Sequence, residues 1–397
     1  MSKVEASKVQ AVEYGIVASA TRVKRFLDLN MELNSLAREA GKHGRVPFIW
    51  GPKGIGKTVT VRDWCLQRGY EWREVPLAQF EEMGDINGFP IVVEEEGRKV
   101  TRTAPPDWVP AQPAEKGGIL FFDDANRAEP RIQRGLMQLY QTYGMVSWKI
   151  PPGWMIVCTG NPEDGDYDVS AMDEAQVTRL THVRMIPNVK AWAEWAECNN
   201  VHPIGINYLI RHPETLETPG QRTCPRTLVE FFDSLGLLGG TTEALKARLE
   251  DVELMGNGSL DSETITQFIT FLSSDSDKVL EPEFILSKPK ETLKHLKTLY
   301  GAGKDAGCKY YDVMNVMATR LTNHLMKEGV SKDLKKDQKT AFLSFLQSGL
   351  TPKGLPKDHV YLIIKTINDS GDRHLIDIWS DSDELVEMIS DGIEDDI

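Results

Sequence analysis

The sequence predicts an α/β protein, with a parallel β-sheet in the first half of the chain and helices in the second. Three observations support this fold class. Short apolar runs recur between helical patterns in the first half, a glycine-rich turn with a lysine joins one such run to a helical segment, and the strand signal fades after about Asn188. Apolar runs separated by helices are typical of strands buried on both faces of a parallel sheet.

A helix is expected before the first strand. The segment SATRVKRFLDLNMELNSLAREAGKHG, residues 19–44, has helical character and ends in glycine-containing sequence that stops a helix. The apolar runs that follow predict strands at residues 45–50, 71–77, 117–124, 153–161 and 181–187. We therefore expect a five-stranded parallel sheet.

The second half is predicted to be mostly helical. Apolar residues fall at helical spacing in KAWAEWAECNN, IGINYLIRH and PRTLVEFFDSLGLL. A proline-bearing stretch at 281–291 indicates a boundary. Residues 369–397 carry eleven acidic side chains and a single arginine, which favours a short amphipathic acidic helix. The predicted divisions are an α/β core at 1–188, a helical lid at 189–285 and a helical C-terminal region at 286–397.

Composition sets broad limits on function. The chain has 397 residues, a formal net charge of −13 and five scattered cysteines without metal-ligand spacing. The acidic balance argues against broad attraction to nucleic acid. Because the N-terminus lacks an apolar signal core and no apolar run approaches the length of a membrane span, we expect a cytoplasmic protein without membrane insertion.

The turn GPKGIGKT fits the phosphate-loop pattern G-x-x-x-x-G-K-[ST], between a strand and a helical segment that stops near Gly69. In such a loop, glycines allow backbone N–H groups to surround phosphate, the lysine meets the β- and γ-phosphates, and the threonine hydroxyl binds Mg²⁺. The alternative is a glycine-rich turn with an incidental lysine. The predicted nucleotide-binding residues are Gly51, Pro52, Lys53, Gly54, Ile55, Gly56, Lys57, Thr58 and Val59.

Two adjacent carboxylates follow the apolar strand in GILFFDDANRAEP. Asp123 is the candidate for the Mg²⁺ shell, together with Thr58. Asp124 is the candidate for the group that orients the attacking water. The alternative for either carboxylate is a capping role, because aspartate is a favoured residue at helix N-termini.

Taken together, residues 14–285 resemble the MoxR-like branch of the AAA+ ATPases. FFDDANRAEPRIQRGLMQLY is similar to that family's Walker B segment, although the family usually has Asp-Glu where this chain has Asp123-Asp124. PLAQFEEMGDINGFPIVVEEEGRKVTRTAPPDWV resembles its second-helix insertion, and the arms around Gly97 independently predict a hairpin at about 91–103. The resemblance suggests client or pore contacts for Arg98, Lys99 and Arg102; a merely solvated hairpin is the alternative.

The resemblance also implies roles for single polar residues. Asn161, in a segment similar to sensor 1, would contact the γ-phosphate or the lytic water, with simple turn chemistry as the alternative. Arg179 occupies the position of an arginine finger that enters the neighbouring subunit's site. Arg226 resembles sensor 2 at the start of a lid helix, where a solvated surface charge is the alternative. Arg127 either acts across a subunit interface or pairs with a nearby carboxylate.

The function that the resemblance implies is Mg²⁺-dependent ATP hydrolysis in a ring, most often a hexamer, that remodels or activates a protein partner. Such ATPases often act with a von Willebrand factor A domain protein. Two alternatives stay open. One is a DNA-acting motor or restriction-type subunit, which the lysine-rich segments at 288–311 and 327–339 suggest but do not favour. The other is a slow nucleotide-gated scaffold, because Asp124 is one methylene shorter than glutamate.

Overall fold

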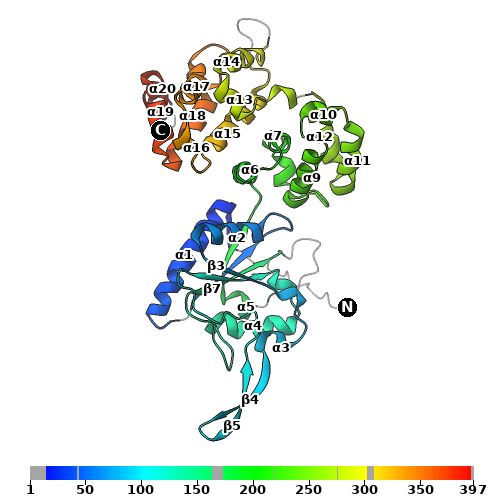
Figure 1. Ribbon diagram of the computed structural model, residues 1–397, viewed down its shortest axis with the longest axis vertical. Helices are drawn as coiled ribbons and strands as arrows, with labels where there is room; N and C mark the ends of the chain where they lie inside the picture. The colour runs from blue at the N-terminus through cyan, green and yellow to red at the C-terminus, as the bar shows by residue number, and fades with distance from the viewer. Residues whose placement is uncertain are drawn as a thin grey trace, which may run out of the picture. The chain divides into compact units, whose positions relative to one another are not determined.

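The computed structural model forms two compact units, Met1–Pro187 and Asn188–Ile397, which we describe separately (Figure 1). The structure describes residues 15–42, 44–162, 172, 174–218, 220–274, 276–301 and 308–394. Part of the predicted sensor 1 segment, residues 163–171 and 173, and the chain end at 395–397 lie outside this range.

The first unit alternates strands with helices. Its elements are β1 (Ile16–Ala18), α1 (Ala20–Glu39), β2 (Val46–Trp50), α2 (Lys57–Arg68), β3 (Glu71–Pro76), the 3-10 turn η1 (Leu77–Gln79), α3 (Met83–Asn87), β4 (Phe89–Glu95), β5 (Arg98–Ala104), β6 (Gly118–Asp123), the 3-10 turn η2 (Ala125–Arg127), α4 (Pro130–Thr142), β7 (Trp154–Gly160), α5 (Glu174–Val177) and β8 (Leu180–Met185).

Six strands form the main sheet, in the order β1-β8-β2-β7-β6-β3, and every neighbouring pair is parallel. The predicted α/β class with a parallel sheet is confirmed, but the predicted number of five strands is wrong. The additional strand is β1, at the edge. It has only three residues, and its Ile16 and Val17 side chains are 58% and 51% exposed, so it is too short to form a recognisable apolar run.

Helices cover both faces of this sheet, with α1 and α2 on one side and α4 on the other (Figure 1). The alternation of side chains along a strand explains the two layers. In β6, Ile119 and Phe121 join the core beneath α1 and α2, whereas Leu120 and Phe122 join the core beneath α4. All residues of β2 and β7 are buried, as expected for central strands of a parallel sheet.

A hairpin of β4 and β5 extends away from the main sheet (Figure 1). Its antiparallel register runs from Phe89 opposite Ala104 to Glu95 opposite Arg98. The two turn residues, Glu96 and Gly97, both have positive φ, at 50° and 76°, which is the geometry of a tight hairpin turn. The hairpin therefore lies where the sequence predicts one, with slightly longer arms.

The second unit is helical throughout its described residues, which confirms the predicted helical second half. Its elements are α6 (Val189–Cys198), α7 (Pro203–Arg211), α8 (Glu214–Glu217), α9 (Pro225–Leu237), α10 (Thr242–Lys246), α11 (Leu249–Ser259), α12 (Ser262–Ser274), the 3-10 turn η3 (Ser276–Lys278), α13 (Pro282–Ser287), α14 (Pro289–Thr298), α15 (Tyr311–Leu325), α16 (Val330–Asp333), α17 (Lys336–Gln347), the 3-10 turn η4 (Ser348–Leu350), α18 (Lys357–Ser370), α19 (Arg373–Ser380) and α20 (Asp383–Glu394).

One continuous apolar core runs through this unit, from Ala193 in α6 to Leu385 in α20. Trp192 and Trp195 pack against it, in agreement with a structural role. The predicted division of the unit near residue 285 stays a prediction. Among the described residues, no helix is both long and apolar enough to cross a bilayer.

A buried charge network also holds the second unit together. Arg320 on α15 is 3% exposed and forms ion pairs with Glu197 of α6, which is 5% exposed, and with Glu281 just before α13. Its guanidinium also donates to Asn207 Oδ1 at 3.1 Å. Burial acts to lower the pKa of Arg320, but the two glutamates outweigh it and the pKa is raised. The network therefore ties helices on both sides of residue 285 to one charged group.

Candidate active site

The strand order brings three separated segments to one edge of the sheet. β7 lies between β2 and β6, so residues that follow these three parallel strands are neighbours. The phosphate loop follows β2, Asn161 follows β7, and Asp123 ends β6. The carboxyl ends of parallel strands are where α/β folds bind ligands.

The phosphate loop depends on its glycines. Gly54 and Gly56 have φ of 71° and 91°, values that other residues adopt only with strain. A Cβ on Gly51 would lie 2.6 Å from the Ile55 side chain and 2.8 Å from the Met185 carbonyl oxygen. α2 begins at Lys57 and ends at Arg68, with Gly69 as its C-cap residue, so the helix stops near Gly69 as the sequence predicts. The loop is thus a compact turn at a helix N-terminus, which is suited to bind an anion.

Lys57 lies at the centre of this turn and is only 7% exposed. Its Nζ donates to the Gly51 carbonyl at 2.8 Å, the Pro52 carbonyl at 3.1 Å and Asn161 Oδ1 at 2.9 Å. A buried ammonium group needs such acceptors to offset the loss of water. The lysine therefore links the phosphate loop directly to the residue that follows β7.

Asp123 and Thr58 form the second part of the site. Thr58 Oγ1 lies 3.3 Å from both carboxylate oxygens of Asp123. Thr159 Oγ1 donates to Asp123 Oδ1 at 2.6 Å. Mg²⁺ prefers oxygen ligands and is typically held by one or two side chains plus substrate phosphates. The hydroxyl–carboxylate pair beside the phosphate loop fits that requirement, and no larger cluster of His, Cys, Asp and Glu side chains suited to a metal occurs among the described residues.

Asp124 has a different environment from Asp123. Its backbone is left-handed, with φ 46° and ψ 44°. Asn161 Nδ2 donates to its Oδ1 at 3.2 Å, and Arg127 Nε lies 3.5 Å from its Oδ2. Of the two alternatives for Arg127, the structure thus contains the pairing with a nearby carboxylate. This pair is partly exposed, with 40% and 33% of the side chains accessible, so it contributes little to stability.

The helix-capping alternative for Asp124 is wrong. Its side chain makes no capping hydrogen bond to η2, and α4 begins only at Pro130, preceded by Glu129. The carboxylate of Asp124 is directed to Asn161 and Arg127 instead.

Asn126 holds Asn161 in place. Its Nδ2 donates to the Asn161 carbonyl at 2.7 Å, and its Oδ1 accepts from the Asn161 N–H at 3.2 Å. Gln133 of α4 in turn donates to the carbonyls of Asn126 and Ala128, at 3.2 and 2.9 Å. Asn126 and Asn161 are each 1% exposed. These bonds fix Asn161 relative to η2, and its contact with the γ-phosphate or the lytic water stays a prediction.

Sequence reasoning missed the roles of Thr159 and the Asn126 side chain. Thr159 lies near the end of β7, two residues before Asn161. Beyond its bond to Asp123, its hydroxyl accepts from the Asp124 N–H at 3.2 Å. The spacing in CTGN carried a signal for Thr159, whereas nothing local indicated that Asn126 reaches across to β7.

Other predicted site residues do not join this group. Val59 is 43% exposed, and Lys53 is exposed as well. Arg179 is partly buried and folds back so that its Nη1 donates to the Ala175 carbonyl; within the described chain no hydrogen bond connects it to the phosphate loop. Arg226 is an exposed residue in the first turn of α9, in the second unit. The roles of Arg179 and Arg226 stay predictions.

The predicted contact residues of the hairpin differ in their surroundings. Arg102 forms a two-pronged ion pair with Glu95, at 2.9 and 2.7 Å, so it is engaged within the hairpin. Arg98 and Lys99 are exposed near the turn. A client contact for these side chains stays a prediction.

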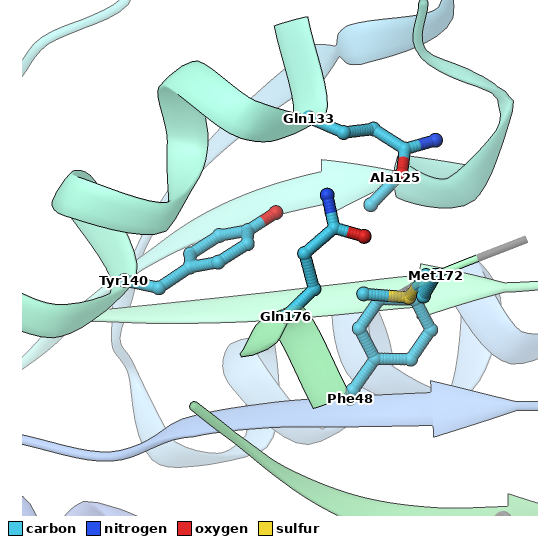
Figure 2. A pocket seen from close by; sticks show the side chains of 6 residues that line it. All are labelled: Phe48, Ala125, Gln133, Tyr140, Met172 and Gln176. Atoms are coloured by element: carbon cyan, nitrogen blue, oxygen red, sulfur yellow. The ribbon is translucent and has the colours of Figure 1, made fainter. Parts of the chain in front are cut away.

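A small cavity lies behind the site, between α4, η2 and α5 (Figure 2). Its volume of ≈ 10 Å³ is close to what a single water molecule needs. Gln133 and Gln176 both point into it, with Tyr140 on one side and Phe48 below (Figure 2). The lining residues are Phe48, Ala125, Gln133, Tyr140, Met172 and Gln176. The cavity is too small for a nucleotide and belongs to the packing around the site.

Comparisons with known proteins were made at three levels. A scan against protein-family models finds no match, and a search of curated proteins finds no matching sequence. Among solved structures, the chain is similar to the Thermotoga maritima RuvB Holliday junction branch migration motor. The two sequences are 16% identical, the alignment covers 84% of this chain and 90% of that chain, and the TM-score is 0.36. A substituted form of the same protein gives 14% identity, coverage of 85% and 91%, and a TM-score of 0.37. These scores are low, so the functional argument rests on this chain's own residues.

Proposed function

We propose that this chain is an AAA+ ATPase of the MoxR-like type, which binds ATP with Mg²⁺ at the end of β2, hydrolyses it and uses the resulting motion to remodel a protein partner. The observation that carries this proposal is the convergence of Lys57, Thr58, Asp123, Asp124 and Asn161. They come from segments that are far apart in the sequence. A glycine-rich turn with an incidental lysine would not need these partners.

Each residue of the group has a distinct task in this proposal. The loop N–H groups and Lys57 bind the phosphates, and the lysine exchanges its present carbonyl and amide partners for phosphate oxygens. Thr58 and Asp123 hold Mg²⁺, which when bound neutralises charge on the phosphates. Asn161 and Asp124, joined by a hydrogen bond of 3.2 Å, orient water near the γ-phosphate.

Within the part of the chain that the structure describes, neither Arg127 nor Arg179 is hydrogen-bonded to the phosphate loop. Arg127 is paired with Asp124, and Arg179 donates to its own short helix. We therefore assign Arg179 to the active site of a neighbouring subunit, where a guanidinium stabilises the transferring phosphoryl group. Assembly into a ring, as a hexamer in the related family, then completes the site, and Arg226 contacts the nucleotide from the lid.

The partner in this proposal is a protein, of which a von Willebrand factor A domain protein is the leading candidate. A DNA-acting motor is the second candidate function, and a slow nucleotide-gated scaffold is the third. Affinity capture with an Asp124→Asn form in the presence of ATP separates them, because this form holds ATP without turnover. Recovery of a protein indicates the remodelling ATPase, recovery of DNA indicates the DNA-acting motor, and recovery of neither indicates the slow nucleotide-gated scaffold.

The direct test is ATP binding and turnover by the purified chain. We expect Lys57→Ala to abolish Mg²⁺-dependent ATP binding measured by calorimetry, because no other buried cation faces the phosphate loop among the described residues. Lys116→Ala is the matched control, since Lys116 is an exposed lysine two residues before β6, at the opposite end of that strand from Asp123. Unchanged ATP affinity in the Lys57→Ala variant would show that the turn is not a nucleotide site.

A further inference from the structure

His182, in the edge-proximal strand β8, connects the phosphate-loop strand to the turn that carries Arg179. The Trp50 indole Nε1 donates to His182 Nδ1 at 2.9 Å. On the other side of the ring, His182 Nε2 lies 2.8 Å from the Val177 carbonyl oxygen. Trp50 is the last residue of β2, directly before Gly51, and Val177 is the last residue of α5, two positions before Arg179.

The two hydrogen bonds define the state of the imidazole. An indole N–H can only donate, so His182 Nδ1 must be the acceptor, and a carbonyl can only accept, so Nε2 must carry the proton. Only the neutral Nε2–H form satisfies both. The ring also stacks on Trp50, with centroids 6.0 Å apart and planes inclined by 22°. His182 is therefore a specific bridge rather than a space-filling side chain.

The segment that the bridge reaches is short and has few internal bonds. α5 has only four residues, Glu174–Val177. The backbone N–H groups of Thr178 and Arg179 bond back to Glu174 and Gln176, at 3.0 and 3.1 Å. A four-residue helix is not stable alone, so its position depends on contacts with its surroundings.

Arg179 itself is in an incomplete environment. Its Nε is buried and has no hydrogen-bond partner among the residues that the structure describes, which is unfavourable for a guanidinium group. Gln176 of α5 lines the small cavity beside α4 (Figure 2). The arginine that follows α5 is thus not fully satisfied by the described residues of its own chain.

We propose that His182 is a positioning residue, which transmits the position of the phosphate-loop strand to Arg179 through the Trp50–His182–Val177 hydrogen bonds. The inference rests on the proposed function, in which Arg179 acts in the neighbouring subunit. A change at one subunit's phosphate loop then alters how that subunit presents Arg179 to the next site. His182 itself touches neither nucleotide nor water.

Two substitutions separate the halves of the bridge. His182→Asn keeps an acceptor near the Nδ1 position for Trp50 and loses the donor to Val177. His182→Gln places its amide near the Nε2 position and keeps the donor to Val177. A positioning role through Val177 predicts a loss of function for His182→Asn and its rescue by His182→Gln.

The test uses subunit mixing, so that the effect is measured on the donated arginine alone. A Lys57→Ala subunit cannot bind ATP but donates Arg179, and an Arg179→Ala subunit binds ATP but lacks the arginine. We expect each to be inactive and their mixture to regain turnover. Adding His182→Asn to the Lys57→Ala donor should lower the recovered kcat about tenfold without changing KM, because a misplaced catalytic group costs rate rather than substrate binding.

The outcomes distinguish the inference from the proposed function. A mixture of Lys57→Ala and Arg179→Ala subunits without any turnover overturns both. Recovered turnover that is equal with His182 and His182→Asn donors overturns the positioning role alone. Should His182→Asn fail to fold by circular dichroism, His182→Phe keeps the stacking ring and removes both hydrogen bonds. It should give the same loss, and full recovery with that donor overturns the inference.

Discussion

Replacement of Thr159 by valine tests the part of the site that sequence reasoning missed. Thr159 is fully buried, and valine has nearly the same shape, so no cavity is created. The substitution removes the hydroxyl that donates to Asp123 Oδ1 at 2.6 Å and accepts from the Asp124 N–H at 3.2 Å. The Asp124 N–H retains a second acceptor, Asp123 Oδ1, also at 3.2 Å.

The structure sets the size of the effect. A hydrogen bond to a charged group contributes about 1.5–3 kcal/mol, so we expect Thr159→Val to lower the free energy of unfolding of the first unit by about 2 kcal/mol. The larger effect is expected on Mg²⁺. Loss of a group that orients a metal-binding carboxylate typically costs about 10-fold to 100-fold in metal affinity.

Calorimetric titration of ATP with Mg²⁺ and with a chelator separates the two effects. Mg²⁺ should increase the ATP affinity of the unmodified chain, and we expect this increase to be about 10-fold or more smaller in Thr159→Val. The ATP affinity measured in chelator should be the same for both proteins. Thr270→Val is the control, because its exposed hydroxyl only donates to the Thr266 carbonyl on α12. An undiminished Mg²⁺ effect in folded Thr159→Val would refute the assignment of Asp123 to the metal.

Two further predictions concern stability. Arg320→Met leaves the buried Glu197 with Lys327 as its remaining ion-pair partner, at 3.3 Å. Because Glu281 is 42% exposed, we expect a loss of stability at the lower end of the range for breaking a buried ion pair, about 3 kcal/mol. The calorimetric unfolding temperature should fall by about 6–12 °C, and a fall of less than about 2 °C would contradict this. Burial lowers the pKa of five histidines in the folded chain: His182, His202, His212, His324 and His359. The unfolded chain therefore binds more protons than the folded chain. The stability that these neutral histidines give to the folded chain is present above about pH 6.5 and is lost as the pH falls below that value. Urea unfolding at about pH 7.5 and about pH 5.5 should show lower stability at the acidic value, and equal stability would rule out neutral folded histidines.

The sequence predicts those parts of the molecule whose signal is local. The phosphate loop, its helix and the five predicted strands are each encoded in contiguous residues, and the structure has all of them. The sequence assigns different candidate roles to Asp123 and Asp124, because Asp124 lies one residue further along the chain and so one step beyond the group that would hold the metal. β1 escaped prediction because it has only three residues, two of them exposed, which is too few to form a pattern.

The remaining parts of the site depend on contacts between distant segments. The bond from Asn126 to Asn161 spans 35 residues, and that from Trp50 to His182 spans 132. These contacts follow from the strand order, in which β7 inserts between β2 and β6 and β8 lies on the other side of β2. No local pattern fixes that order, so the roles of Asn126 and His182 emerge only from the fold.

The central claim is that one chain carries an incomplete ATPase site and that Arg179 of a neighbour completes it. The most direct measurement is ATP turnover per subunit as a function of protein concentration. We expect turnover per subunit of the unmodified chain to rise with concentration as subunits assemble, and Arg179→Ala to bind ATP normally yet turn over about 10³-fold more slowly at every concentration. Turnover that is independent of concentration and unaffected by Arg179→Ala would contradict the account.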